Sequence, residues 1–126
     1  MRCATARRQG QLDSSPFTLR VAHITPVESL RNLHVLCDSS LNFQQHVNRV
    51  VSSSFYQLRA IKISIKTLPF ETAKTTVDYF VINQINYCSS LLAGIPQYVL
   101  DRLQRVINAS VACLIAAQEN ILTYLV

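Results

Sequence analysis

Apolar and polar residues alternate in two short runs near the N-terminus, residues 17–24 and 30–37. Their apolar sides are formed by Phe17, Leu19 and Val21 in the first run and by Leu33, Val35 and Cys37 in the second. Such alternation is typical of half-buried strands. Because Thr25 and Pro26 stop the first run, we expect one β-hairpin within residues 17–40, with its loop near residues 26–29. A lone hairpin is barely stable, so it must pack on helices or on strands outside this chain.

From residue 41 the apolar period becomes that of amphipathic helices, and we expect three of them over residues 41–117. Asn42 followed by Gln45 resembles a capping box, in which the side-chain oxygen of the first residue accepts an N–H group at the helix start. This first helix is expected to run to about Lys62. Its apolar stripe comprises Phe43, Val47, Val50, Val51, Leu58 and Ile61. Residues 52–54 are serines, which are poor helix formers, so packing must hold that turn.

Prolines and a glycine delimit the other two helices. Pro69 opens the second, where its missing N–H costs nothing, and Glu71 in the first turn suits the helix dipole. The segment after the second helix is expected to end at Gly94 as its C-cap, and Pro96 begins the third helix. The expected buried stripes are Phe70, Ala73, Val77, Phe80, Val81, Ile85 and Cys88 in the second helix and Leu100, Leu103, Val106, Ile107, Val111 and Leu114 in the third.

The two ends of the chain differ from this central part. Residues 1–16 are polar, basic and aperiodic, and we expect a disordered leader. Residues 118–126 are mostly apolar and stop abruptly, which is the pattern of a truncated apolar tail. If exposed, this tail would form an adhesive surface. Its candidates for self-association are Ile121, Leu122, Tyr124 and Leu125.

Composition supports a mainly α fold, in which the N-terminal β-hairpin precedes a three-helix bundle. A chain of 126 residues holds one domain at most. An apolar content of 49% argues against a disordered chain, and only 2 Gly and 4 Pro leave few tight turns for a sandwich or barrel.

The positive charge of the chain indicates a polyanionic partner. A net charge of +5 and a pI of about 9.3 fit nucleic acid or an acidic membrane surface. Arg59, Lys62 and Lys66 are spaced i, i+3, i+7 and share a face if the first helix continues that far, while Arg102 and Arg105 lie off the apolar stripe of the third helix. Two interpretations are open: a solvated face, or a stripe of cations that follows phosphate groups.

The sequence contains no catalytic constellation, and we expect neither an enzyme nor a cofactor. The carboxylates are scattered, whereas two-metal phosphoryl chemistry needs them clustered. The 4 cysteines are far apart, with no C-x-x-C pair and no histidine at metal-ligand spacing, so no metal site is expected. We interpret them as reduced thiols, with Cys88 and Cys113 as small core residues.

Targeting signals are also absent from the pattern. No apolar run reaches membrane-spanning length, and the N-terminus lacks the apolar segment of a secretory signal. We therefore expect an intracellular protein, cytoplasmic or nuclear, that is not secreted and has no membrane partner.

Six stretches share their order and spacing with a known family: Leu30–Leu41, Phe43–Val47, Phe55–Arg59, Phe70–Lys74, Asn86–Leu92 and Leu103–Ala109. Together they resemble the C-terminal part of reverse transcriptases from non-LTR, LINE-type retrotransposons, and the resemblance covers about residues 27–115. It implies that residues 30–37 correspond to the palm-edge hairpin that grips the primer end. The helices would correspond to the thumb, which holds the template–primer duplex.

The chain departs from this family at several positions. The paired catalytic aspartates of the family precede this region and are not in this chain. His34 stands where the family usually has glycine, so a tight backbone position is disturbed. Residues 83–86 replace an Arg-Leu-Asp run, Ala112-Cys113 replaces Ala-Arg, and residues 1–16 match nothing in the family. These are the features of a decayed copy of an element.

These observations predict a non-catalytic fragment of an RNA-directed DNA polymerase. Its residual activity would be non-specific binding of an RNA–DNA or DNA duplex through Arg59, Lys62, Lys66, Arg102 and Arg105. The alternative is a small helical module that binds a protein partner, or a second copy, through the apolar C-terminal segment. A third possibility is an unstable remnant without function, because its partner palm is missing.

Overall fold

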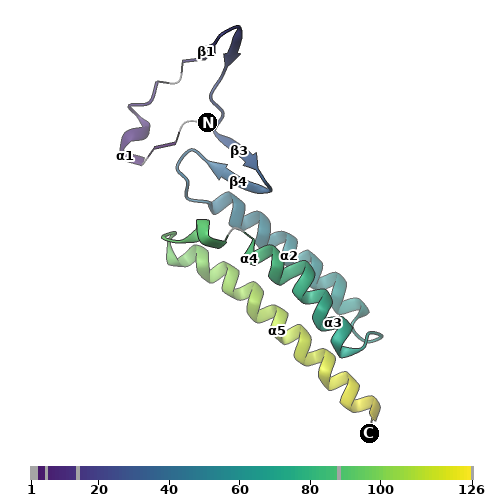
Figure 1. Ribbon diagram of the computed structural model, residues 1–126. Helices are drawn as coiled ribbons and strands as arrows, with labels where there is room; N and C mark the ends of the chain where they lie inside the picture. Colours follow the sequence, from purple (N-terminus) through teal and green to yellow (C-terminus); the bar gives the residue numbers. More distant parts are fainter. Residues whose placement is uncertain (1–2, 5, 14, 88, 126) are drawn as a thin grey trace. The chain divides into compact units, whose positions relative to one another are not determined.

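A computed structural model of the chain describes residues 3–4, 6–13, 15–87 and 89–125, and of residues 6, 9, 121, 124 and 125 it describes the backbone only. The elements in Figure 1 confirm the predicted mainly α fold, with an N-terminal hairpin ahead of the helices. Although the length of the chain predicts a single domain, the contacts divide it into two compact units, Met1–His46 (unit 1) and Val47–Val126 (unit 2).

Unit 1 contains two small hairpins instead of the one predicted. Antiparallel strands β1 (Phe17–Leu19) and β2 (Ala22–Ile24) form the first, and β3 (Ser29–Asn32) and β4 (Val35–Asp38) form the second. The predicted pairing of residues 17–24 with residues 30–37 is therefore wrong. Each run instead folds back on itself, because closing a two-residue loop costs less chain entropy than closing the longer loop between the runs.

Both hairpin loops use the left-handed region of the backbone. Arg20 has φ 55°, and Leu33 and His34 have φ 46° and 69°. In the β3–β4 loop both central residues have positive φ, which is the geometry of the type I′ turn and favours Asn and Gly. Leu41 and Phe43, in the segment before the helices, also have positive φ. Unit 1 thus holds five residues with side chains in a conformation that costs free energy.

The remaining structure of unit 1 is sparse. One helical turn, α1 (Ala6–Gln9), lies within the segment predicted to be a disordered leader. The strands β1 and β2 are exposed throughout, whereas Val35, Phe43 and His46 are buried. The backbone N–H of Leu36 donates to Nδ1 of His46 at 3.3 Å. Few apolar side chains therefore contribute to the stability of this unit.

The helical part begins with α2 (Gln44–Ser64). Asn42 Oδ1 accepts the N–H of Gln44 at 2.9 Å, as predicted for Asn42 at the helix start. The N–H of Asn42 itself donates to Oδ1 of Asp38 at 3.0 Å, so Asp38 takes the place that the predicted capping box gives to Gln45. The chain then continues through α3 (Phe70–Val77), the π-helical turn η1 (Asp78–Ile82), α4 (Asn83–Asn86) and the 3-10 turn η2 (Ser89–Leu92) to α5 (Gln97–Leu125). Gly94 has φ 84° and ends the connection before Pro96, as predicted.

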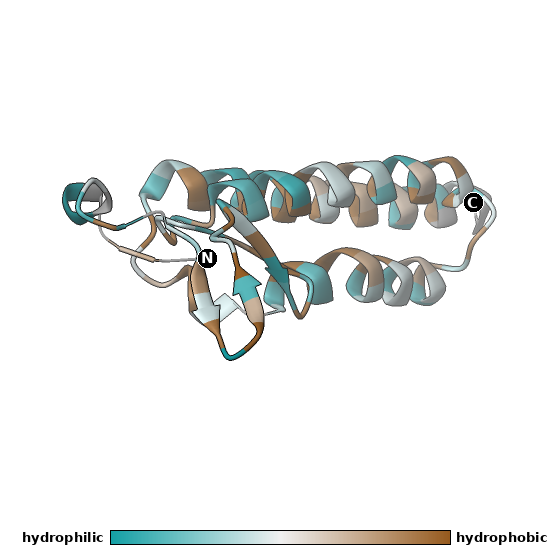
Figure 2. Ribbon diagram, turned by 90° about the horizontal axis from the view of Figure 1, so that it is seen from above, coloured by the Kyte–Doolittle hydropathy of each residue, from teal (hydrophilic) through white to brown (hydrophobic). Residues whose placement is uncertain are grey.

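Apolar and polar residues are interspersed on every helix of unit 2 (Figure 2). Among the described residues, no helix is both long enough and apolar enough to span a membrane. The core of the unit lies where the buried stripes of its helices meet. It comprises Val47, Val50, Leu58, Ile61, Ile65, Ala73, Val77, Val81, Ile85, Val99, Leu103, Val106, Cys113 and Ala117. Cys113 is buried as predicted, whereas Cys88 lies outside the described residues.

The middle segment keeps one face buried by means of its π-helical turn. Its buried residues Ala73, Val77, Val81 and Ile85 recur every four residues. A regular α-helix, with 3.6 residues per turn, rotates such a series away from the core. The wider π turn over residues 78–82 compensates for this rotation. It also moves Phe80, predicted to be buried, to the surface, where the side chain is 46% exposed.

The buried stripe of α5 is rotated from the predicted one. Leu103 and Val106 are buried as predicted, but Val111 is 51% exposed. The described centre of the stripe instead contains Val99, Ser110, Cys113 and Ala117. Ser110 tolerates burial because its hydroxyl donates to the Val106 carbonyl at 2.9 Å. The helix also continues to Leu125, so residues 118–125 of the segment predicted to be an apolar tail are helical.

Replacing Ser54 by alanine is expected to stabilise the protein. Ser54 is fully buried in α2, and its hydroxyl has no hydrogen-bond partner among the described residues. Removing an unpaired buried hydroxyl should raise the free energy of unfolding by about 1 kcal/mol. Urea denaturation followed by circular dichroism measures this change.

Ser110→Ala is the matched control, because it makes the same change at a buried helical site whose hydroxyl is paired. Both variants gain the same helix propensity, so the difference between them reports on the hydroxyl alone. If Ser54→Ala were no more stable than Ser110→Ala, the Ser54 hydroxyl would have a partner.

Candidate nucleic-acid interface

Helices α2 and α5 run in the same direction (Figure 1), and residues of both helices line shared hollows. Near their N-terminal ends, Nη1 of Arg102 donates to Oδ1 of Asn48. Farther along, Lys62 of α2 and Ala116 of α5 line the same hollow. The two pairs have the same offset in sequence, as parallel helices require. Two hollows follow the seam between these helices.

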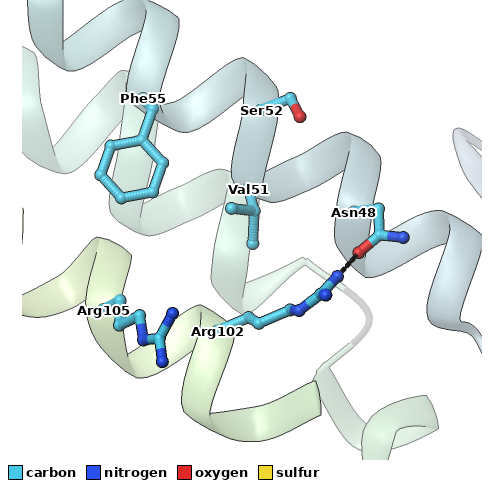
Figure 3. A pocket seen from close by; sticks show the side chains of 6 residues that line it. All are labelled: Asn48, Val51, Ser52, Phe55, Arg102 and Arg105. Carbon is cyan, nitrogen blue, oxygen red and sulfur yellow. Dashed lines mark hydrogen bonds between the residues drawn. The ribbon is translucent and has the colours of Figure 1, made fainter. Parts of the chain in front are cut away.

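The first hollow has a volume of about 400 Å³ and is lined by Asn48, Val51, Ser52, Phe55, Arg102 and Arg105. Figure 3 shows that Val51 and Phe55 point from α2 towards α5, whereas Arg102 and Arg105 come from α5. The hollow thus has a side on α2 where polar Asn48 and Ser52 lie beside the two apolar residues, and a cationic side on α5.

The second hollow has a volume of about 310 Å³ and is lined by Phe55, Leu58, Arg59, Lys62, Ala109, Ala112, Cys113 and Ala116. Here the cations come from α2. The three alanines of α5 are short, and they leave space opposite Arg59 and Lys62. Since Phe55 lines both hollows, we describe the two together as the α2–α5 groove.

The charge of the α2–α5 groove is positive. Arg59, Lys62, Arg102 and Arg105 are all exposed, and no carboxylate of the described residues lines the groove. Arg102 bonds to a neutral amide, and the other three cations form no ion pair within the described part of the chain. Unit 2 as a whole has seven Lys and Arg against four Asp and Glu. A groove of this kind concentrates anions at the surface.

The structure brings four of the five predicted cations together. The exception is Lys66, which was predicted to continue the face of Arg59 and Lys62 if the first helix extended that far. Because α2 ends at Ser64, Lys66 lies in the following turn and lines neither hollow. The two cation pairs come from helices that are separated by the whole middle segment, so only the tertiary fold joins them.

Sequence reasoning gave no binding role to the other residues of the groove, among them Asn48, Phe55 and Cys113. A signal for Phe55 was present, because it precedes Arg59 and Lys62 at i, i+4, i+7 spacing and so shares their helix face. The contribution of α5 had no such signal. Which of its faces meets α2 depends on the burial of Ser110, and a hydropathy pattern does not reveal that.

Cys113 lies at the base of the second hollow, where two influences act on its thiol. Burial raises the pKa of Cys113, because it disfavours the thiolate, and the positive charge of Lys62 opposes this shift. The thiol is therefore held protonated at neutral pH. Such a group is unsuited to nucleophilic chemistry.

A third hollow, of about 560 Å³, lies between the α4–η2 segment and α5. Its walls include Ile85, Leu92, Leu100, Leu103 and Ile107. It is largely apolar and contains none of the five predicted cations. Among the described residues, no group of His, Cys, Asp or Glu is arranged to hold a metal ion. The α2–α5 groove is therefore the candidate site, and its chemistry is that of binding.

Comparisons of the chain with protein-family models, with curated proteins and with solved structures find no match. The interpretation of the groove consequently depends on the geometry and charge described above.

Lys62→Gln is expected to raise the pKa of Cys113 further, because it removes the charge that opposes the effect of burial. In a chain whose other three cysteines are serine, the midpoint of the pH profile of alkylation should move to higher pH. Lys66→Gln, outside the groove, should leave the midpoint unchanged.

The same shift predicts how stability depends on pH. The folded state keeps the Cys113 proton at a pH where the unfolded thiol, with a pKa of about 8.5, loses it. The contribution of Cys113 to the free energy of unfolding is thus fully present below this pH and decreases as the pH rises.

The alkylation experiment can contradict the proximity of Lys62 and Cys113. It does so if the alkylation midpoint of Lys62→Gln equals that of the parent chain.

Proposed function

We propose that this chain is the thumb-like, non-catalytic part of an RNA-directed DNA polymerase of the non-LTR retrotransposon kind. Its contribution is non-specific binding of nucleic acid through the α2–α5 groove. One observation carries this proposal: four cations from two helices distant in sequence line a single groove with no carboxylate of the described residues among them. The same proposal places this binding in the cytoplasm or nucleus, where nucleic acid is present.

The dimensions of the groove agree with a phosphate backbone as ligand. Along α5, the groove extends from Arg102 to Ala116, which corresponds to about 20 Å at 1.5 Å per residue. One strand of B-form DNA carries a phosphate about every 3.4 Å along the axis, so several phosphates fit this length. Neutralising them releases counterions, and this release supplies most of the free energy of non-specific binding.

The β3–β4 turn also supports the proposal. The resemblance to non-LTR reverse transcriptases leads us to expect glycine, and hence a tight backbone, at the position of His34. This residue lies in the two-residue turn with φ 69°, a region that favours glycine. The local geometry thus has the form that the resemblance implies, although the residue differs.

A second candidate function is association with a protein through α5. Val111, Ile115 and Leu122 share one face of this helix, and the last two are 53% and 56% exposed. Exposed apolar side chains at helical spacing are typical of a protein-binding face. Of the residues predicted for self-association, Leu122 lies on this face. The side chains of Ile121, Tyr124 and Leu125 are not among those that the structure describes.

Affinity for an RNA–DNA duplex is expected to fall steeply with salt. Each of Arg59→Gln, Lys62→Gln, Arg102→Gln and Arg105→Gln should reduce the slope of log K against log salt concentration by about one, because each removes one phosphate contact. Fluorescence anisotropy of a labelled duplex at several salt concentrations measures the slope. Lys74→Gln, an exposed cation of α3 outside the groove, is the control. Equal slopes in all five variants would exclude the groove as the contact surface.

The second candidate predicts a concentration-dependent oligomer that Ile115→Lys and Leu122→Lys convert to monomer, since a charge on an apolar contact face opposes association. Sedimentation velocity detects this change. Ile63→Lys replaces an apolar residue of α2 that is even more exposed, and it should have no effect on the oligomer. A monomer at all concentrations in the parent chain would rule out self-association.

A further inference from the structure

Only part of the Phe55 side chain contributes to the core of unit 2. Its side chain is half-buried, and the buried part packs against the core. The remainder lines both hollows of the α2–α5 groove. Tyr79 and Phe80 pair edge to face at 5.2 Å, whereas Phe55 has no aromatic partner within the described part of the chain. The part of the ring that borders the two hollows is therefore accessible to a ligand.

The cations of the groove are distributed on both sides of this ring. Arg102 and Arg105 line the hollow towards the N-terminal ends of the two helices, as Figure 3 shows, and Arg59 and Lys62 line the hollow towards the C-terminal end of α2. A chain of phosphates along the groove would therefore contact cations before and after Phe55. The order cation, aromatic ring, cation along the groove matches the order phosphate, base, phosphate along a nucleic-acid strand.

A paired duplex cannot use such a ring, because its bases are stacked inside the helix and only its backbone and groove edges are accessible. An unpaired strand can turn a base out and stack it on an aromatic side chain. The alanines opposite Arg59 and Lys62 leave the space next to Phe55 that a planar base requires.

We propose that the α2–α5 groove binds a single unpaired nucleic-acid strand, with one base stacked on Phe55 and the flanking phosphates held by Arg102 and Arg105 on one side and by Arg59 and Lys62 on the other. This inference rests on the proposed function, since it requires that the groove bind nucleic acid, and it adds the form of the ligand.

The natural sequence makes a direct test possible, because the chain has no tryptophan. Phe55→Trp places a single tryptophan at the proposed stacking position, where its emission can be excited selectively over that of the tyrosines, and an aromatic replacement is accommodated where the ring faces open space. Titration with oligothymidylate should quench its emission, whereas inorganic polyphosphate, which has charge but no bases, should bind without quenching. Tyr56→Trp, at an exposed neighbouring position of α2 outside the groove, should not be quenched by either ligand.

A second variant tests the same point by affinity. Phe55→Leu keeps an apolar side chain against the core but removes the stacking surface, so affinity for oligothymidylate should fall about tenfold while affinity for polyphosphate stays the same. Tyr56→Leu should change neither. Circular dichroism melting of each variant verifies the fold, and Phe55→Trp decides the question if Phe55→Leu does not fold.

The possible outcomes separate this inference from the proposed function. Salt-dependent binding of oligothymidylate and polyphosphate with equal strength, without quenching in Phe55→Trp, would leave the groove as an anion site but overturn the stacked base. Preferential binding of an RNA–DNA duplex over oligothymidylate would likewise overturn it. Absence of binding to every polyanion would overturn both proposals.

Discussion

The packing of unit 2 depends on the buried stripes of its three helical segments, which face one another and form one continuous core. In α2, from Val47 on, and in α5 the buried residues recur at intervals of three and four, which keeps one face of each helix towards the core. The middle segment has intervals of four only, and its π-helical turn restores the alignment. Buried small residues, namely Ala73 of α3 and Ser110 and Ala117 of α5, allow α3 and α5 to approach closely.

The site is a geometric consequence of this stripe. Once the buried faces of α2 and α5 are fixed, the next residue around each helix lies at the edge of the seam. On α2 these residues include Phe55 and Arg59, and on α5 they include Arg105 and Ala109. A cation at such an edge extends its charged group into water while its methylene groups rest on apolar neighbours. The groove therefore arises from the same packing that stabilises the core.

Much of the helical part was predictable because its signals are local. Asn42 acts through a side-chain hydrogen bond to the neighbouring backbone, and Pro69 and Gly94 act through their own backbone geometry; all three mark the ends of segments as expected. The face of α5 was not predictable to the same degree, because the burial of Ser110 depends on a hydrogen bond to Val106 that hydropathy does not register. The strand pairing failed for another reason: alternation identifies strands but not their partners.

The groove itself could be predicted only in part. Spacing along α2 places Arg59 beside Lys62, but their proximity to the arginines of α5 follows from the direction in which two distant helices pack. Lys66 illustrates the opposite error, since an i+7 relation has meaning only while the helix continues. Predicting the groove from sequence therefore requires the ends of the helices and their partners, and the number of cations alone does not provide these.

The distribution of backbone conformations implies that the two units differ in cooperativity. The five described residues with side chains at positive φ all belong to unit 1, whereas in unit 2 the only described residue at positive φ is Gly94, which has no Cβ to strain. Strain and sparse burial both lower the free energy of local opening. We therefore expect unit 1 to open and reclose in subglobal events that leave the helical core of unit 2 intact.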